Sequence, residues 1–264
     1  MYVYFLQEAL RMENPSFLDT FFLKGFVGNI LSNTEHEWYP DSKPLFFIVF
    51  ALSLIAISVA AYLLGSLNFA IIISGKQYKQ DIRSFGSKNA GMTNMMRTYG
   101  KKAAGLTLLG DALKAMVSCL LGYAVFGQLG AYIAGFFCIL GHVFPIYYRF
   151  KGGKGVVTAA VAILMCHPIV FLILLAVFLI IVLFTKYISL GSIMCVLIYP
   201  VVLSWFPSGR TFAVFAVLTT VIVVFKHWEN IKRLRAGTES KFSFKKSVKK
   251  AEEVPNESNE DSSK

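Results

Sequence analysis

Long apolar stretches, separated by short polar and basic segments, fill most of the chain between residues 44 and 225. A helix needs about 20 apolar residues to cross the hydrocarbon core of a bilayer. The pattern therefore predicts an all-α, polytopic membrane protein. Its expected spans cover about residues 44–74, 103–126, 130–148, 156–184, 188–204 and 211–225.

The stretch from Val156 to Phe184 has two interpretations. Its 29 residues exceed one span and fall short of two full ones. His167 and Pro168 lie near its middle, and a helix over 156–166 would rise only about 16 Å. As two short helices, this stretch brings the total to seven spans. As one long helix, it leaves six.

The distribution of basic residues decides between these models, because cytosolic loops carry an excess of Lys and Arg. Most of the 26 Lys and Arg residues lie in loop 76–102, in loop 149–155, at Lys186 and in the tail from Lys226. Two short helices place all four regions on one side, whereas one long helix moves the basic tail away. We therefore expect seven spans, with the N-terminus outside and the C-terminus in the cytosol.

Composition agrees with a membrane protein, since 56% of the residues are hydrophobic and the mean hydropathy is +0.60. A net charge of +11 would point to nucleic acid in a soluble protein. Here the basic residues flank apolar spans, so we expect membrane lipids and anionic substrates as partners. The four cysteines lack metal-ligand spacing, and we expect neither a metal nor a disulfide framework.

Three regions follow from this pattern. Residues 1–43 are predicted to be an extracytoplasmic N-terminal extension, and residues 44–239 the membrane domain. Residues 240–264 are predicted to be a cytosolic tail, first basic and then acidic and disordered. The oligomeric state stays open.

The loop RFKGGKG, residues 149–155, directly precedes a predicted helix. The free N–H groups and positive dipole end of that helix would face the loop. Glycine lets a backbone approach an oxyanion closely, and lysine adds positive charge. We interpret the loop as a phosphate site, with a basic membrane anchor as the alternative. Its candidate residues are Lys151, Gly152, Gly153, Lys154 and Gly155.

The longer loop 76–102 contains the string GSKNAGMTN, flanked by Arg83 and Arg97. Arginine together with hydroxyl and amide donors suits phosphate binding. A solvated connecting loop is the alternative, although loops of this length are often functional. The polar candidates inside the string are Ser87, Asn89, Thr93 and Asn94.

Several polar residues lie within or beside the apolar spans. Asp111 and Lys114 share a helix face, and charges inside spans usually mark function. A structural ion pair is the alternative for these two. His142 follows an apolar run and is a candidate substrate contact or an interface histidine. His227 and Asn230 follow the last span, as candidate site residues or headgroup anchors.

Five strings in this order carry a family resemblance. They are LLGSLNFA (63–70), DIRSFGSKNAGMTNMMRTYGKKAAGL (81–106), LGDALKA (109–115), LGHVFPIYYRFKGGKGVVTA (140–159) and HWENIKRLRAGTE (227–239). Together they resemble the PlsY family of bacterial acyl-phosphate:glycerol-3-phosphate acyltransferases. The chain departs from the family pattern at Leu67-Asn68, where Ile-Pro is usual, and at Lys88, where Gly is common.

The resemblance implies a seven-span protein of the bacterial cell membrane with its active site on the cytosolic side. It implies acyl transfer from acyl phosphate to the 1-hydroxyl of glycerol 3-phosphate, giving lysophosphatidic acid and phosphate, the first acylation in phospholipid synthesis. No acyl-CoA, acyl carrier protein or metal is implied. Glycines of KGGKG would cradle phosphate. By motif, the functional positions are Ser87, Arg97, Lys154, His227 and Asn230.

Two other functions fit parts of the pattern. Broken helices and charges within spans suit a membrane transporter of a phosphorylated or other anionic solute. However, the polar motifs concentrate at one surface, and the sequence shows no paired halves. A scaffold protein anchored by its basic tail would leave GSKNAGMTN unexplained.

Overall fold

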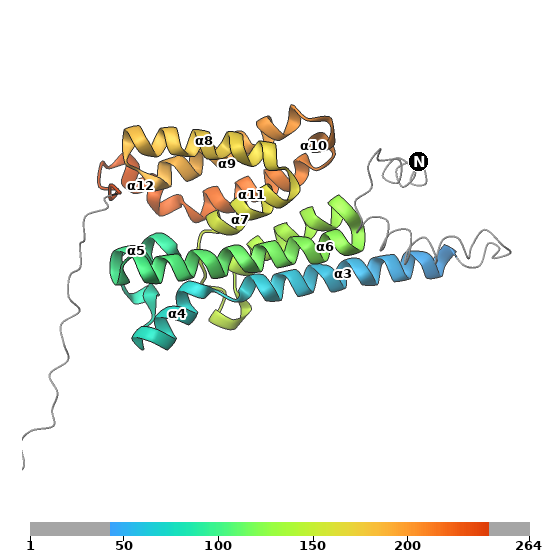
Figure 1. The fold of residues 1–264 in the computed structure, drawn as a ribbon, viewed down its shortest axis with the longest axis horizontal. Coiled ribbons are helices and arrows are strands. Elements are labelled where there is room, and N and C mark those ends of the chain that lie inside the picture. The colour runs from blue at the N-terminus through green and yellow to red at the C-terminus, as the bar shows by residue number, and fades with distance from the viewer. Residues whose placement is uncertain (1–42, 243–264) are drawn as a thin grey trace, which may run out of the picture.

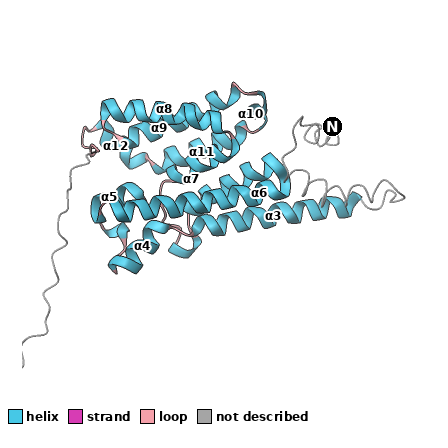
Figure 2. Ribbon diagram, viewed as in Figure 1, coloured by secondary structure: helices cyan, strands magenta, loops and turns pink. Residues whose placement is uncertain are grey.

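The computed structural model describes residues 43–242 of the 264-residue chain, and every regular element in that range is helical (Figure 2). Expectations for residues 1–42 and 243–264 fall outside the described range and stay predictions. The short 3-10 helices are η3 (Ile82–Ser84) and η4 (Ile146–Tyr148). The α-helices are α3 (Lys43–Ser66), α4 (Phe69–Tyr78), α5 (Met92–Tyr99), α6 (Lys101–Val143), α7 (Val156–Cys166), α8 (Pro168–Thr185), α9 (Ile188–Ser204), α10 (Pro207–Thr211), α11 (Ala213–Lys226) and α12 (Trp228–Arg235).

Helix α6 reverses direction at residues 126–127, where the backbone leaves the helical region. Lys114 Nζ lies 2.9 Å from His142 Nδ1, whereas a straight helix would separate these residues by about 42 Å. Gly122 and Gly130 pack backbone to backbone, since a Cβ on Gly122 would lie 2.1 Å from the Gly130 oxygen. The expected turn between the second and third apolar stretches is therefore confirmed, and α6 consists of two antiparallel halves.

The ambiguous stretch after residue 155 breaks at His167, as the two-helix interpretation predicted. Proline is tolerated at the first position of a helix, so Pro168 begins α8. Lys154, before α7, hydrogen-bonds to Asn230. Ser189, after α8, hydrogen-bonds to Glu239, which also binds Asn230. Because both outer ends reach one cluster, α7 and α8 form a hairpin.

The first predicted span, residues 44–74, is interrupted between α3 and α4. The side-chain oxygen of Asn68 accepts a hydrogen bond from a backbone N–H in the first turn of α4, at 3.2 Å. The Lys114 ammonium donates to the carbonyl oxygens of Gly65 (2.9 Å) and Leu67 (2.7 Å). A capping asparagine and a buried ammonium thus satisfy backbone groups that the break exposes. Apolar composition alone could not reveal this interruption.

By length and composition, three stretches of the described range could cross a bilayer: Ile48–Tyr78, Lys101–Tyr148 and Pro168–Thr185. A fourth counts if α11 and α12, bent by 59°, form one span. Helices α7 and α9 are shorter, with 11 and 17 residues. The structure thus shows a helical protein with three or four such stretches, and seven spans stay a prediction.

The helices lie side by side along the long axis of the bundle (Figure 1). Helices α4, α5 and α12 gather at one end, on the left of Figure 1, and α10 lies at the other. At the first end, Arg97 donates a hydrogen bond to the Ser240 carbonyl (3.4 Å). At the other, Gln128 donates to the Cys166 carbonyl (3.4 Å). The basic segments therefore share one end of the bundle, as the charge distribution predicted.

Candidate functional site

Asn94 organises the loop that joins α4 to α5. Its side-chain oxygen accepts a hydrogen bond from the backbone N–H of Ser87 at 3.0 Å. Gly86 has a φ of +56°, and a Cβ there would lie 2.3 Å from this oxygen. The predicted substrate contact Asn94 is 1% exposed, and its side chain holds the loop together. Its amide nitrogen donates to the carbonyls of Ile82, Phe85 and Asn89, at 3.2, 2.9 and 3.0 Å.

The loop presents Ser87 and Arg97 at the surface, while Asn89 and Thr93 are half-buried. Arg97 lies in the last turn of α5. Lys88, the departure from the family pattern, has a φ of +58°. This left-handed conformation favours glycine, which agrees with the glycine that the resemblance implies at this position.

Gly152 and Gly153 are packed against the end of α6. Their N–H groups donate to the carbonyls of Val143 (3.3 Å) and His142 (3.1 Å), respectively. A Cβ on Gly153 would lie 2.2 Å from His142 Nε2 and 2.5 Å from the Ala90 oxygen. The structure therefore gives both glycines a packing role. The two amides expected to cradle phosphate already have partners in the protein.

The start of α7 offers other amides to an anion. Gly155 precedes the helix with a φ of +79°, and no side chain caps it. The first α-helical hydrogen bond runs from the Ala159 N–H to the Gly155 carbonyl, at 2.8 Å. The N–H groups of residues 156–158 therefore lie in the first turn, beside Lys154 and at the positive end of the helix dipole. This geometry supports the predicted anion site, with its donors shifted toward the helix.

Lys154 begins a chain of hydrogen bonds that reaches the C-terminal segment. Its ammonium donates to the side-chain oxygen of Asn230, and the Asn230 amide donates to Glu239 at 2.7 Å. Ser189 and Arg233 also donate to Glu239, each at 2.7 Å. Sequence reasoning assigned no role to Glu239, Arg233 or Ser189. One signal in the sequence could have identified Glu239, because it is the last residue of HWENIKRLRAGTE (227–239), the fifth string that carries the family resemblance.

Burial lowers the pKa of Lys154 to about 8. The Glu239 carboxylate acts in the opposite direction, while the positive charges of Arg233, Arg97 and Lys226 lower the pKa further. Burial raises the pKa of Glu239, but hydrogen bonds from its three donors outweigh this effect and the pKa falls. Glu239 is therefore ionised at neutral pH, in a region that is otherwise positive.

His227 lies between α11 and α12 and is 2% exposed. Its Nδ1 is 2.7 Å from the carbonyl oxygen of Val223. A carbonyl can only accept, so Nδ1 carries the proton and Nε2 has a free lone pair in the neutral ring. The ring also interacts electrostatically with Lys154. His227 therefore offers a hydrogen-bond acceptor near the Lys154 ammonium.

Asp111, Lys114 and His142 form a buried cluster beneath the Gly152–Gly153 segment. Lys114 Nζ lies 2.8 Å from Asp111 Oδ1 and 2.9 Å from His142 Nδ1. The Lys114 ammonium also holds the break between α3 and α4. These three residues contact one another and the backbone, which supports the glycine segment. Direct contact with substrate stays a prediction.

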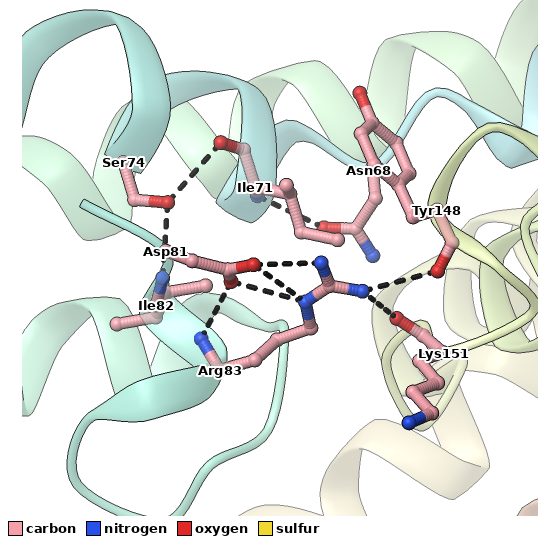
Figure 3. A network of polar contacts seen from close by, with 8 residues as sticks. All are labelled: Asn68, Ile71, Ser74, Asp81, Ile82, Arg83, Tyr148 and Lys151. Carbon is pink, nitrogen blue, oxygen red and sulfur yellow. Dashed lines mark hydrogen bonds and ion pairs between the residues drawn. The ribbon is translucent and has the colours of Figure 1, made fainter. Parts of the chain in front are cut away.

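Arg83 joins the two loops (Figure 3). Its Nε and Nη2 donate to the Asp81 carboxylate, at 3.0 and 2.6 Å. Its Nη1 donates to the carbonyls of Tyr148 (3.1 Å) and Lys151 (3.0 Å). Arg83 has the chemistry of a phosphate ligand, but its nitrogens are bound to protein partners. The Lys151 side chain is exposed and points away from Arg83.

Segments far apart in the chain meet at this end of the bundle. Helix α5 contributes Arg97, the loop before α7 contributes Lys154, and the segment after α11 contributes His227 and Asn230. Two cations and amide donors can hold two anionic groups close together, and the neutral imidazole can accept a hydrogen bond from a hydroxyl. Within residues 43–242, no group of three His, Cys, Asp or Glu side chains could hold a metal ion.

A family model, individual relatives and solved structures all indicate the same family for this chain. Residues 55–237 match the family model for glycerol-3-phosphate acyltransferase. The glycerol-3-phosphate acyltransferase of Finegoldia magna is 42% identical over 72% of this chain and 96% of that protein. The enzyme of Rhizobium etli is 43% identical over 72% of this chain and 92% of that protein.

Two solved structures are also similar. One is the crystal structure of PlsY, an integral membrane glycerol 3-phosphate acyltransferase, in its glycerol 3-phosphate form. It has a TM-score of 0.68 and 34% identity, and the match covers 72% of this chain and 96% of that one. The lysophosphatidic acid form has a TM-score of 0.65 and 33% identity. The chain therefore belongs to the glycerol-3-phosphate acyltransferase family.

Proposed function

We propose that this membrane acyltransferase takes its acyl group from an acyl phosphate and transfers it to the 1-hydroxyl of glycerol 3-phosphate. The hydroxyl oxygen forms an ester bond to the acyl carbon, and the bond from that carbon to the phosphate oxygen breaks. The products are lysophosphatidic acid and inorganic phosphate. The similar PlsY structures in glycerol 3-phosphate and lysophosphatidic acid forms support the acceptor and the product.

This proposal rests mainly on Lys154, which precedes α7 and whose ammonium is hydrogen-bonded to Asn230. The positive charge of Arg97 is close enough to lower the pKa of Lys154. Both substrates are anions, and a reaction between them needs positive charge that offsets their repulsion. Phosphate is already a good leaving group. The protein then has to hold the hydroxyl near the acyl carbon and stabilise the charge that develops there.

The site residues divide by the segments that carry them. Arg97 and Ser87, on the loop before and within α5, bind one phosphate together with the amides at the start of α7. Lys154, His227 and Asn230 orient the other substrate. The hydrogen bond between Lys154 and Asn230 and the electrostatic interaction of the buried His227 with Lys154 support this assignment.

The proton of the attacking hydroxyl has two candidate acceptors. One is Nε2 of His227, whose lone pair follows from the hydrogen bond at Nδ1. The other is an oxygen of the donor phosphate itself. The His227→Gln variant separates them, because glutamine keeps a hydrogen-bond acceptor but is not a base. A general base contributes about 10²- to 10⁴-fold to the rate, so retained turnover would assign the proton to phosphate.

We further propose seven spans in a bacterial cell membrane, with the basic end of the bundle in the cytosol. The reversal within α6, the α7–α8 hairpin and the shared end of the basic segments support this topology. Single cysteines at Lys88 and Arg210, exposed and at opposite ends, test it. An impermeant thiol reagent added to intact cells should label the Arg210→Cys protein only. Labelling of Lys88→Cys from outside would reverse the orientation.

The acyl donor can be tested directly. Purified protein in detergent would receive glycerol 3-phosphate with either palmitoyl phosphate or palmitoyl-CoA. The proposal expects lysophosphatidic acid from the acyl phosphate alone. If lysophosphatidic acid formed from palmitoyl-CoA at an equal or higher rate, acyl phosphate would be wrong as the proposed donor. The family assignment would still hold.

A further inference from the structure

The turn between η4 and the glycine segment has an unusual backbone. Arg149 and Phe150 follow each other with φ values of +56° and +58°. Non-glycine residues rarely adopt this left-handed conformation, at a cost on the order of 1 kcal/mol or more each. Such a turn persists only where surrounding contacts hold it. It lies two residues before Gly152, so its shape sets the direction in which the chain enters the segment that carries Lys154.

Backbone hydrogen bonds from Phe150 N–H to the Pro145 carbonyl (2.9 Å) and from Lys151 N–H to the Tyr148 carbonyl (3.2 Å) hold the turn from within, and Arg83 holds it from the other loop. A single nitrogen, Nη1, donates to the carbonyls of Tyr148 and Lys151, the residues on either side of the left-handed pair (Figure 3). These oxygens belong to the loop before α7, whereas Arg83 belongs to η3, which opens the loop with Ser87. One guanidinium thus bridges the two loops that carry the predicted substrate contacts.

Asp81 fixes this guanidinium in place. Its carboxylate accepts from the Arg83 backbone N–H at 2.9 Å and from both Nε and Nη2. The pKa of Asp81 falls because of its hydrogen bonds with Arg83. The planar fork of arginine grips the carboxylate through two nitrogens and leaves a third for the two carbonyls, a bidentate geometry that the single nitrogen of lysine cannot reproduce. The arginine is therefore oriented toward the backbone and its charge is already neutralised.

We propose that Arg83 is a positioning residue for acyl transfer, which sets the spacing between the loop with Ser87 and the loop with Lys154 by holding the left-handed turn 149–150. The proposal rests on the proposed function for its kinetic consequence. Its structural consequence, a fixed distance between the two loops, does not depend on that function. Arg83 acts through Asp81 and the backbone and touches no substrate.

Kinetics of single and double variants test this role. Arg83→Gln should lower kcat/KM by about 10- to 100-fold, because a displacement of about 1 Å at a site has that effect. Asp81→Asn should give a comparable loss, and the double variant should lose little more. Arg83→Lys, which keeps the charge, should recover only part of the activity. Arg235→Ala, at an exposed arginine on α12, serves as the matched control and should behave as wild type.

A distance measurement keeps the test independent of turnover. Spin labels at Lys88→Cys and Arg149→Cys, in a background without other reactive cysteines, report the separation of the two loops. Pulsed electron resonance should show a narrow distribution that broadens with Arg83→Gln and stays narrow with Arg235→Ala. Should Arg83→Gln fail to fold, Arg83→Lys and Asp81→Asn carry both measurements.

Two results would overturn the proposal. One is an unchanged distance distribution in the Arg83 and Asp81 variants, whatever their activity. The other is a pair of kinetic results: Asp81→Asn behaves as wild type, while Arg83→Gln raises the KM for only one of the two phosphorylated substrates. Together these results would show that Arg83 binds that substrate directly. If wild-type protein showed no acyl transfer, the proposed function would fail, and the distance measurement would still decide the role of Arg83.

Discussion

The Lys154 ammonium donates a hydrogen bond to the side-chain oxygen of Asn230, a residue 76 positions further along the chain. This contact joins the loop before α7 to α12, and Glu239 extends it by binding Asn230 at 2.7 Å. A cation held this way needs little reorganisation when a phosphate arrives. Activity should therefore depend on the protonation of Lys154.

We predict that kcat/KM declines above about pH 8. Burial lowers the pKa of Lys154 to about 8, so the ammonium is charged below that pH and loses its proton above it. The pH profile of kcat/KM reports groups of the free enzyme. The Lys154→Arg variant, whose guanidinium stays charged, should lose this alkaline decline even if its overall rate is lower. An alkaline limb that stays in place in Lys154→Arg would assign the decline to another group.

Arg97→Ala should abolish turnover while leaving folded protein. Arg97 is exposed at the end of α5, and it donates a long hydrogen bond to the Ser240 carbonyl. Truncation of such a side chain costs little stability, whereas loss of a cation from a site for two anions should be severe. Phosphate release and thermal unfolding in detergent measure the two effects. Full activity of Arg97→Ala would remove Arg97 from the site.

Gly153→Ala should be far more damaging than Gly105→Ala. A Cβ on Gly153 would press on His142 and on the Ala90 carbonyl, at 2.2 and 2.5 Å, whereas a Cβ on Gly105 meets nothing within 4 Å. In mid-helix, alanine is favoured over glycine by about 0.5–1 kcal/mol, so Gly105→Ala should be neutral or stabilising. Unfolding temperature and kcat/KM of both variants check this. Equal behaviour of the two would contradict the packing role of Gly153.

Lys114→Met should destabilise the protein by about 3–5 kcal/mol, because it leaves the buried Asp111 carboxylate without its cation. The ammonium also serves the Gly65 and Leu67 carbonyls at the helix break. Thermal unfolding in detergent measures the loss. Adding Asp111→Asn should recover part of it. A single variant that unfolds at the wild-type temperature would show that the cluster contributes nothing to stability.

Apolar periodicity and charge predicted most of the fold. The stop at His167, the reversal near Gly127 and the common end of the basic segments follow from chain length, proline chemistry and the placement of Lys and Arg. The break at Asn68 could not be predicted, because it depends on Lys114, 47 positions away from Leu67. A side chain that satisfies distant carbonyls leaves no local signal in the sequence.

The candidate site divides in a similar way. Sequence strings identified Lys154, His227 and Asn230, and the structure brings these residues together. The sequence strings could not distinguish residues that contact substrate from residues that hold the loops in place. Asn94 and Arg83 have the chemistry of phosphate ligands, yet their hydrogen-bonding groups are used within the protein. Glu239 was missed because a carboxylate repels anionic substrates, and only the folded structure shows the three donors that hold it.

Acyl transfer from acyl phosphate to glycerol 3-phosphate at the Lys154 cluster can be tested directly. Its most direct test supplies purified protein in detergent with both substrates and measures phosphate release and lysophosphatidic acid. We expect both products to form in equal amounts, and only when glycerol 3-phosphate is present. Phosphate release that does not depend on glycerol 3-phosphate, or no release from folded wild-type protein, would contradict it. Activity that appeared only across sealed vesicles would instead indicate a transporter.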